Sequence, residues 1–187
     1  MKLTELAHKI LFPHLLYGDC AVDMTAGNGL DTLYLSKLVG ESGHIFSFDI
    51  QKAAIEQTNK LMSENQQIFN YRLIHSCHTK IEEKIPRSFF QKIKAITFNL
   101  GYLPTSNKSI ITTPQSTRYA VEKSYEWMAH DGVMTILAYR GHVGGADETE
   151  TITEWANRVP VHHEMITGND SPESPVLFVI KKSERFN

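Results

Sequence analysis

Short apolar runs alternate with longer amphipathic stretches along nearly the whole chain, and this alternation restricts the fold more than any other feature. An alternating order of strands and helices is typical of α/β proteins with a mainly parallel sheet. The runs typical of strands lie at 20–24, 44–49, 71–74, 93–98, 132–138 and 176–180, and helical patterns lie at 3–11, 30–39, 51–64, 112–129 and 146–158. The sequence therefore predicts an α/β fold.

The C-terminal region departs from this alternation. A weaker strand pattern at 161–166 is followed by a turn sequence at 168–172 and then by the run at 176–180. Two β runs joined by a short polar turn indicate a hairpin. We therefore expect a mostly parallel seven-stranded sheet whose C-terminal strand is antiparallel.

Length and charge limit the classes of protein to which the chain can belong. Its 187 residues carry 19 basic and 21 acidic side chains, and domains average roughly 150 residues, so we expect a single domain over 1–187. The near-neutral charge excludes a polybasic coat of nucleic acid, but a local basic patch such as 80–94 is compatible with an RNA substrate. The apolar runs are too short to span a bilayer and no signal-peptide pattern is present, so we expect a cytoplasmic protein without membrane contact.

A glycine-containing loop follows the first predicted strand. Gly27 and Gly29 let the backbone turn sharply and approach a ligand closely. Asp49 ends the second strand 20 residues after Gly29, where an acid accepts hydrogen bonds from the ribose hydroxyls of an adenosine ligand. Thr32 replaces the third glycine of a dinucleotide-binding loop, which disfavours a pyrophosphate and favours S-adenosylmethionine, whose ammonium Asp31 can meet. A tight turn without a ligand is the alternative.

The fourth predicted strand runs into Asn99, Leu100, Gly101 and Tyr102, at the edge where open α/β sheets bind ligands. The Asn99 side-chain oxygen and the Leu100 carbonyl can accept hydrogen bonds from an amino group and so align its lone pair with a methyl donor. Tyr102 can stack on a base. The segment is similar to the Asn/Asp-Pro-Pro-Tyr motif of amino-methyltransferases, with Leu-Gly in place of Pro-Pro. A strand end capped by asparagine is the alternative.

Two further segments are expected at the same edge. Ser76 and His78 follow the third strand, where they either bind the adenine edge or serve as structural polar residues. The segment 139–145 follows the fifth strand, and its glycines beside Arg140 and His142 suit either a loop that contacts RNA or a plain strand-to-helix turn. The remaining histidines and the two cysteines lack metal-ligand spacing, so no metal site is expected.

Four blocks together carry a resemblance to a known family: DMTAGNGLDT at 23–32, FDIQ at 48–51, FNLGYLP at 98–104 and YRGH at 139–142. They resemble the bacterial family known as "putative rRNA methylase". Its characterised members (MnmM, formerly YtqB) convert 5-aminomethyl-2-thiouridine at the wobble position of tRNA to the 5-methylaminomethyl form, using S-adenosylmethionine. The resemblance implies a Rossmann-like class I methyltransferase with helices on both faces of the sheet. It also implies a homodimer that acts on the anticodon stem-loop of tRNA.

The resemblance assigns roles to individual residues. The implied cofactor contacts are Thr25, Gly27, Asn28, Gly29, Asp31, Thr32, Asp49, Gln51, Ser76, His78 and Asn99. The implied contacts to the modified uridine or the RNA are Leu100, Gly101, Tyr102, Arg140, Gly141 and His142, and the implied catalytic positions are Asn99, Tyr102, Tyr139 and His142.

The implied acceptor sets a requirement on the site. A primary alkylamine has a pKa near ~10, by analogy with lysine, so it must lose a proton before its lone pair can react. His142 is the candidate proton acceptor and Tyr139 a weaker one. The residues alone leave open an amine on ribosomal RNA or on a small molecule, and a protein that binds the cofactor without catalysis. The missing third glycine disfavours a nucleotide-dependent oxidoreductase.

Overall fold

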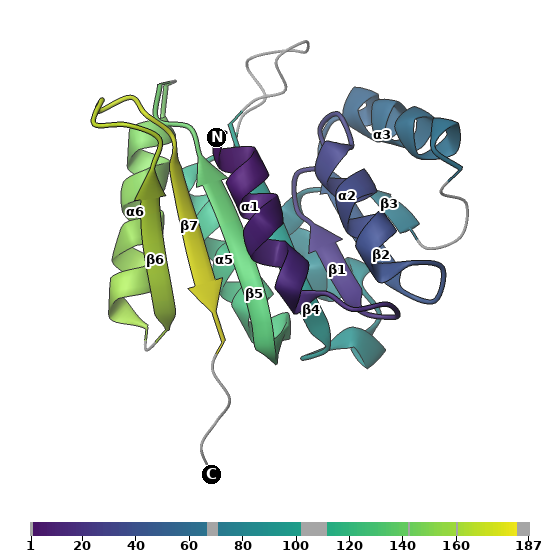
Figure 1. The fold of residues 1–187 in the computed structure, drawn as a ribbon. Helices are drawn as coiled ribbons and strands as arrows, with labels where there is room; N and C mark the ends of the chain where they lie inside the picture. The colour runs from purple at the N-terminus through teal and green to yellow at the C-terminus, as the bar shows by residue number, and fades with distance from the viewer. Residues whose placement is uncertain (1, 67–70, 102–111, 142, 160, 183–187) are drawn as a thin grey trace.

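The computed structural model describes residues 2–66, 71–101, 112–141, 143–159 and 161–182, and its centre is a seven-stranded sheet (Figure 1). The strands are β1 (Cys20–Asp23), β2 (His44–Asp49), β3 (Tyr71–His75), β4 (Ile93–Leu100), β5 (Met128–Ala138), β6 (His162–Thr167) and β7 (Val176–Lys181). They lie in the order β3-β2-β1-β4-β5-β7-β6. Strands β1 to β5 pair in parallel, and β7 pairs antiparallel with both β5 and β6. The predicted mostly parallel sheet with an antiparallel C-terminal strand is confirmed.

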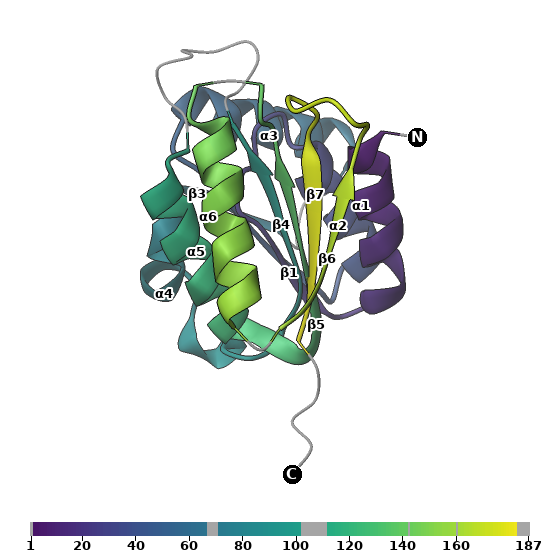
Figure 2. The ribbon, with the colours of Figure 1, turned by 90° about the vertical axis from the view of Figure 1, so that its left-hand side faces the viewer.

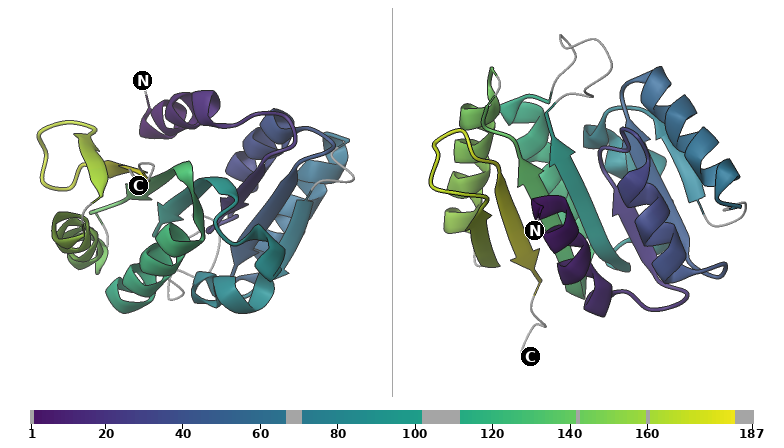
Figure 3. Two further views of the ribbon diagram at one scale, coloured as in Figure 1. Left: turned by 90° about the horizontal axis from the view of Figure 1, so that it is seen from below. Right: turned by 45° about the horizontal axis from the view of Figure 1, so that its top comes forward.

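Helices cover both faces of this sheet. They are α1 (Leu3–Leu11), α2 (Leu30–Val39), α3 (Lys52–Glu64), α4 (Ile81–Lys84), α5 (Pro114–Trp127) and α6 (Gly145–Arg158), with 3-10 turns η1 (Phe12–His14), η2 (His78–Lys80) and η3 (Arg87–Phe89). Helices α1, α2 and α3 lie on one face, and α4, α5 and α6 lie on the other (Figure 2 and Figure 3). This Rossmann-like arrangement agrees with the expected one. No helix in the described ranges is long and apolar enough to cross a membrane.

Each face of the sheet has its own apolar core. Large buried side chains such as Phe98 and Trp127 fill the core toward α4, α5 and α6. On the opposite face Leu11 packs with Leu137 of β5 and Leu177 of β7. The first helix therefore packs on strands that lie near the C-terminal end of the sequence. Burying one leucine stabilises a fold by roughly 1.5–3 kcal/mol, so the contact of Leu11 contributes to the position of α1 together with that of the buried Ala7.

Burial explains why some strands are easier to predict than others. Strands β1, β5 and β7 are buried along most of their length on both faces, and they have the nearly continuous apolar sequences typical of central strands. The edge strand β6 has only exposed and half-buried residues, so its pattern is weaker.

Two segments differ from the expectation. Strand β5 begins at Met128, inside the stretch expected to be helical, because Met128 pairs with Ile93 of β4 across a register shift. Residues in the stretch 78–89 form α4 and short 3-10 turns that the sequence pattern did not predict. Elements of three or four residues are too short for hydrophobic periodicity to reveal them.

The strand order places the predicted site residues together. Strand β1 lies between β2 and β4. The chain continues from β1 to β2 and β3 on one side of it, and then returns to β4 and β5 on the other side, so the strand order reverses at β1. Open α/β sheets bind ligands outside the carboxyl ends of the strands at such a switch point. The carboxyl ends of β1, β2 and β4 carry the glycine loop, Asp49 and Asn99.

Candidate active site

A cavity of about 890 Å³ opens at the carboxyl ends of β1, β2, β4 and β5, beside α1. Of the predicted site residues, its wall contains Thr25, Gly27, Asn28, Asp31, Asp49, Gln51, His78, Asn99, Leu100, Gly101, Tyr139 and Gly141. Gly29, Thr32, Ser76 and Arg140 are not part of this wall. Tyr102 and His142 lie outside the described residues.

Two backbone N–H groups hold the Asp49 carboxylate, one from the glycine loop and one from the residue just before α3. The Gly27 N–H donates to Asp49 Oδ2 at 2.9 Å, and the Gln51 N–H donates to Oδ1 at 2.8 Å. Each carboxylate oxygen keeps a further lone pair for a ligand. The carboxylate therefore stands at the cavity wall in one orientation, with capacity for the two hydroxyls of a ribose.

Gly29 and Thr32 shape the loop from behind the wall. Gly29 precedes α2 with φ +82°, and a Cβ there would lie 2.9 Å from the Cα of Thr58 in α3. The Thr32 hydroxyl donates to Asp23 Oδ2 at 2.7 Å and lies 2.9 Å from Ser47 Oγ. These positions in the loop motif serve backbone geometry and packing.

Asp23 is fully buried beneath the loop. Its Oδ1 accepts a hydrogen bond from the Thr25 N–H at 3.1 Å, and its Oδ2 accepts the one from Thr32. Burial, and then the nearby charge of Asp31, raise the pKa of Asp23 to about 7. The carboxyl therefore orders the loop from below and is not an open ligand group.

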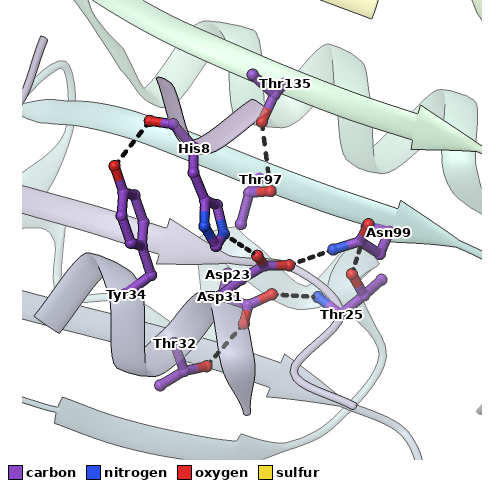
Figure 4. A network of polar contacts seen from close by, with 9 residues as sticks. All are labelled: His8, Asp23, Thr25, Asp31, Thr32, Tyr34, Thr97, Asn99 and Thr135. Atoms are coloured by element: carbon purple, nitrogen blue, oxygen red, sulfur yellow. Dashed lines mark hydrogen bonds and ion pairs between the residues drawn. The ribbon is translucent and has the colours of Figure 1, made fainter. Parts of the chain in front are cut away.

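Asp31 joins two residues from distant parts of the chain (Figure 4). His8 Nε2 of α1 lies 2.5 Å from Asp31 Oδ1, and Asn99 Nδ2 donates to Asp31 Oδ2. The Asn99 N–H donates to Thr25 Oγ1 at 2.6 Å, which ties the end of β4 to the glycine loop. Because Asp31 holds Nδ2 of Asn99, the carbonyl oxygen Oδ1 remains as the acceptor of that side chain.

His8 was not predicted as a site residue. It comes from the first helix, and its ring stacks on Tyr34 of α2, with ring centroids 3.8 Å apart and planes 2° from parallel. With Thr4 and Glu5, it brings α1 into the cavity wall. The sequence offers only a weak signal for His8: it follows Ala7 within the helical pattern expected at 3–11. The structure shows that Ala7 is buried.

His78 presents a buried nitrogen acceptor at the wall. Its side chain is nine-tenths buried, and burial lowers its pKa to about 4, opposed by a hydrogen bond to the Met24 backbone. The ring is therefore neutral at neutral pH, and Nε2 has no hydrogen-bond partner among the described residues. An unpaired buried acceptor is costly, so this atom suits a ligand that brings an N–H group, such as the adenine amino group.

The two residues that follow β5 have different surroundings: Tyr139 lies in the cavity wall, and Arg140 does not. Burial, and then the charge of Asp31, raise the pKa of Tyr139, so its phenol stays protonated and acts as a donor at neutral pH. Arg140 turns toward the β6–β7 connection, where its Nε donates to the Ser174 carbonyl at 2.6 Å and its Nη2 to the Ser171 carbonyl at 3.3 Å.

The end of β4 is tied to the helices below it through Glu148, which is almost fully buried in α6. The Gly101 N–H donates to Thr112 Oγ1 at 3.2 Å, and Thr112 Oγ1 donates to Glu148 Oε2 at 2.9 Å. Thr117 of α5 donates to the other carboxylate oxygen. The strand end that carries Asn99 is therefore anchored on two sides.

Comparison with known proteins identifies the family. The model of the family described as "Putative rRNA methylase" matches residues 45–181. The chain belongs to this family. A chloroplastic tRNA (mnm5s2U34)-methyltransferase of Arabidopsis thaliana is 34% identical over 98% of this chain and 70% of its own length.

Solved structures of similar proteins agree with this assignment to the rRNA methylase family. A "putative rRNA-methylase" of Clostridium thermocellum is 34% identical, with a TM-score of 0.88 and 96% of both chains covered. A "putative methyltransferase" of Streptococcus mutans, solved in complex with SAH, is 29% identical, with a TM-score of 0.85, and 97% of this chain and 98% of that chain are covered. This member of the family is an S-adenosylmethionine-dependent methyltransferase.

The described residues fit that cofactor. Asp49 offers oriented acceptors to a ribose, and His78 Nε2 offers a buried acceptor to an adenine amino group. The Asp31 carboxylate lies in the same wall and would suit the ammonium of the methionine part. Asn99 lies in the wall of the same cavity of about 890 Å³.

Proposed function

We propose that the protein is a tRNA methyltransferase that N-methylates 5-aminomethyl-2-thiouridine at the wobble position to give 5-methylaminomethyl-2-thiouridine. The Arabidopsis relative, whose name states a tRNA mnm5s2U34 methyltransferase activity, supports the substrate class. The observation that carries the proposal is the orientation of Asn99, whose Nδ2 donates to Asp31 and whose Oδ1 is thereby an acceptor at the cofactor cavity. An amine acceptor requires this polarity.

The cofactor supplies a methyl group on a positively charged sulfur: the S–CH₃ bond breaks, an N–CH₃ bond forms and the positive charge moves to nitrogen. The protein aligns the amine for this displacement. Asn99 Oδ1 and the Leu100 carbonyl accept its N–H hydrogens, which leaves the lone pair directed away from them. Tyr139 remains a phenol and donates a hydrogen bond.

The amine must arrive without its extra proton. We keep His142 as the proposed proton acceptor; it lies outside the described residues. A pH profile of methyl transfer by His142→Ala that matches that of the wild type, at a near-wild-type rate, would overturn this role.

The proposed reaction is tested by methyl transfer from labelled S-adenosylmethionine to bulk tRNA from cells that lack the gene, followed by nucleoside mass spectrometry. We expect one methyl to be gained on 5-aminomethyl-2-thiouridine and the precursor peak to disappear. Asn157→Ala, on the exposed side of α6, serves as the control variant and should keep full activity. Cofactor binding without transfer to tRNA would reject this substrate and favour an amine on ribosomal RNA or on a small molecule.

We also propose that the protein is a cytoplasmic homodimer that binds the anticodon stem-loop. Phosphate contacts make binding of RNA weaken steeply with salt. A KM that does not change with salt would contradict an RNA acceptor, and light scattering that gives the mass of a single chain would contradict the dimer.

A further inference from the structure

We propose that His8 is a positioning residue for methyl transfer: through Asp31 it holds the side-chain amide of Asn99 with Oδ1 toward the acceptor amine. The inference rests on the proposed function, because it concerns the orientation of an amine acceptor. It assigns a role to α1, which lies outside the stretch 45–181 that matches the family model.

The geometry places His8 and Asn99 on the two oxygens of one carboxylate. His8 Nε2 lies 2.5 Å from Asp31 Oδ1, and Asn99 Nδ2 donates to Asp31 Oδ2 (Figure 4). A carboxylate hydrogen-bonded at both oxygens cannot rotate without breaking one of the bonds. The bond to His8 therefore limits the positions at which Asp31 can hold Asn99.

The polarity of this chain of contacts decides which end of the Asn99 amide meets the acceptor. An ionised carboxylate only accepts hydrogen bonds, so it selects Nδ2 and excludes Oδ1 from the Asp31 side. If Asp31 turned away, the amide could flip and present N–H donors to the N–H hydrogens of the amine. Such a contact is repulsive and would turn the reacting lone pair out of line.

His8 is itself held rigidly enough to act in this way. Its ring is stacked on Tyr34 at 3.8 Å, and the Tyr34 hydroxyl donates to the His8 carbonyl at 2.8 Å. The His8 side chain is 26% exposed and that of Asp31 16%, so their contact is largely shielded from water. Residues that hold reacting groups must have their own positions fixed by packing and hydrogen bonds.

This role is separable from cofactor binding. A carboxylate has about four lone-pair sites, and His8 and Asn99 occupy one each, so Asp31 keeps sites for an ammonium. Loss of the His8 contact removes the restraint on Asp31 without removing its charge. We therefore expect a change in kcat with little change in the Kd of the cofactor.

Two substitutions separate the hydrogen bond from the packing of the ring. His8→Phe keeps a flat ring on Tyr34 but has no N–H, whereas His8→Gln places a side-chain N–H near the position of Nε2 without a ring. We expect His8→Phe to lower kcat by about tenfold, with KM for tRNA and Kd for S-adenosylmethionine within about threefold of wild type. We expect His8→Gln to keep kcat within about threefold.

Other outcomes reject the role. Wild-type kcat in His8→Phe would overturn it, and so would equal losses in His8→Phe and His8→Gln, which would assign His8 to packing. His162→Phe, at an exposed histidine of the edge strand β6, is the control for the His-to-Phe change itself and should leave kcat unchanged. Thermal unfolding of each variant verifies that it is folded.

A spectroscopic measurement keeps this proposal distinct from the proposed function. The side-chain ¹⁵N and ¹H resonances of Asn99 report the contact with Asp31 without any turnover. They should be similar in the wild type and His8→Gln but shifted in His8→Phe, and identical resonances in all three would overturn the positioning role. Failure of the wild type to methylate tRNA would reject only the proposed function.

Discussion

On the cofactor side of the cavity carboxylates accept hydrogen bonds from backbone N–H groups, whereas on the acceptor side the side chains of distant segments bind one another. Asp49 holds Gly27 and Gln51, and Asp23 holds Thr25, all within the first two strands and their loops. On the acceptor side, residue pairs separated by 23 and 68 positions meet at Asp31. The first arrangement uses backbone groups of the adjacent strands β1 and β2 and their loops, and the second adds the first helix and the end of β4.

The largest effect on turnover is expected on the acceptor side, from Asn99→Ala. Loss of the alignment should lower kcat by about 10²-fold, because misplacement of a reacting group by about 1 Å has effects of this size. The Kd of S-adenosylmethionine should stay within about threefold, since the principal cofactor contacts lie elsewhere. Steady-state kinetics and calorimetry test this together. A loss of cofactor binding in a folded Asn99→Ala protein would mean that the two sides are not separable.

Asp49→Ala tests the cofactor side. Loss of charge-assisted hydrogen bonds worth roughly 1.5–3 kcal/mol should weaken S-adenosylmethionine binding by about 10- to 150-fold. Two N–H groups, those of Gly27 and Gln51, also lose their partner. Calorimetric titration measures the change, with the exposed Asp170→Ala as control. An affinity equal to that of the wild type would remove Asp49 from the cofactor site.

Gly29 and Gly144 have nearly the same φ angle but differ in how closely they are packed. Gly29 (φ +82°) faces Thr58 at 2.9 Å from an added Cβ, whereas Gly144 (φ +83°) faces open space. Gly144→Ala should cost only the left-handed strain of about 1–2 kcal/mol. Gly29→Ala should cost about 1–3 kcal/mol more, because of the collision. Urea unfolding measures the free energy of unfolding of both variants. Equal losses of this free energy would show that α3 moves away from the added methyl group without cost.

Asp23 should make the free energy of unfolding depend on pH. The folded chain keeps this carboxyl protonated up to about pH 7, whereas the unfolded chain ionises it near ~4. The folded state therefore binds more protons in this interval, and the contribution of Asp23 to the free energy of unfolding falls as pH rises through it. Asp23→Asn lacks this contribution, so its stability deficit relative to the wild type should narrow between about pH 4 and about pH 7. A deficit independent of pH would contradict the raised pKa.

The same contrast explains what the sequence could predict. Strands buried on both faces have continuous apolar runs, and the glycine loop and Asp49 follow two of them, so the fold and the cofactor edge were predictable. The cofactor contacts implied for Gly29 and Thr32 stay predictions: neither residue is part of the cavity wall, and Gly29 passes close to Thr58 while Thr32 binds Asp23.

His8 could not be predicted for a different reason. Its position at the site depends on how α1 crosses the sheet, and no local pattern encodes that crossing. The early start of β5 at Met128 has the same origin, because it depends on pairing with Ile93. Tertiary contacts decide both, and they decide the acceptor side of the site more than the cofactor side.

The packing of α1 on β5 and β7 joins segments that are synthesised at very different times. Leu11 packs with Leu137 of β5 and Leu177 of β7, so the first helix rests on a strand that is translated much later. On a ribosome that adds about 5–20 residues per second, β7 follows α1 by roughly 10–30 s. During that interval the nascent chain already contains the glycine loop and then Asn99, but Leu11 of α1 lacks its contact with Leu177 of β7. The packing of α1 on the sheet is therefore completed only when β7 joins β5.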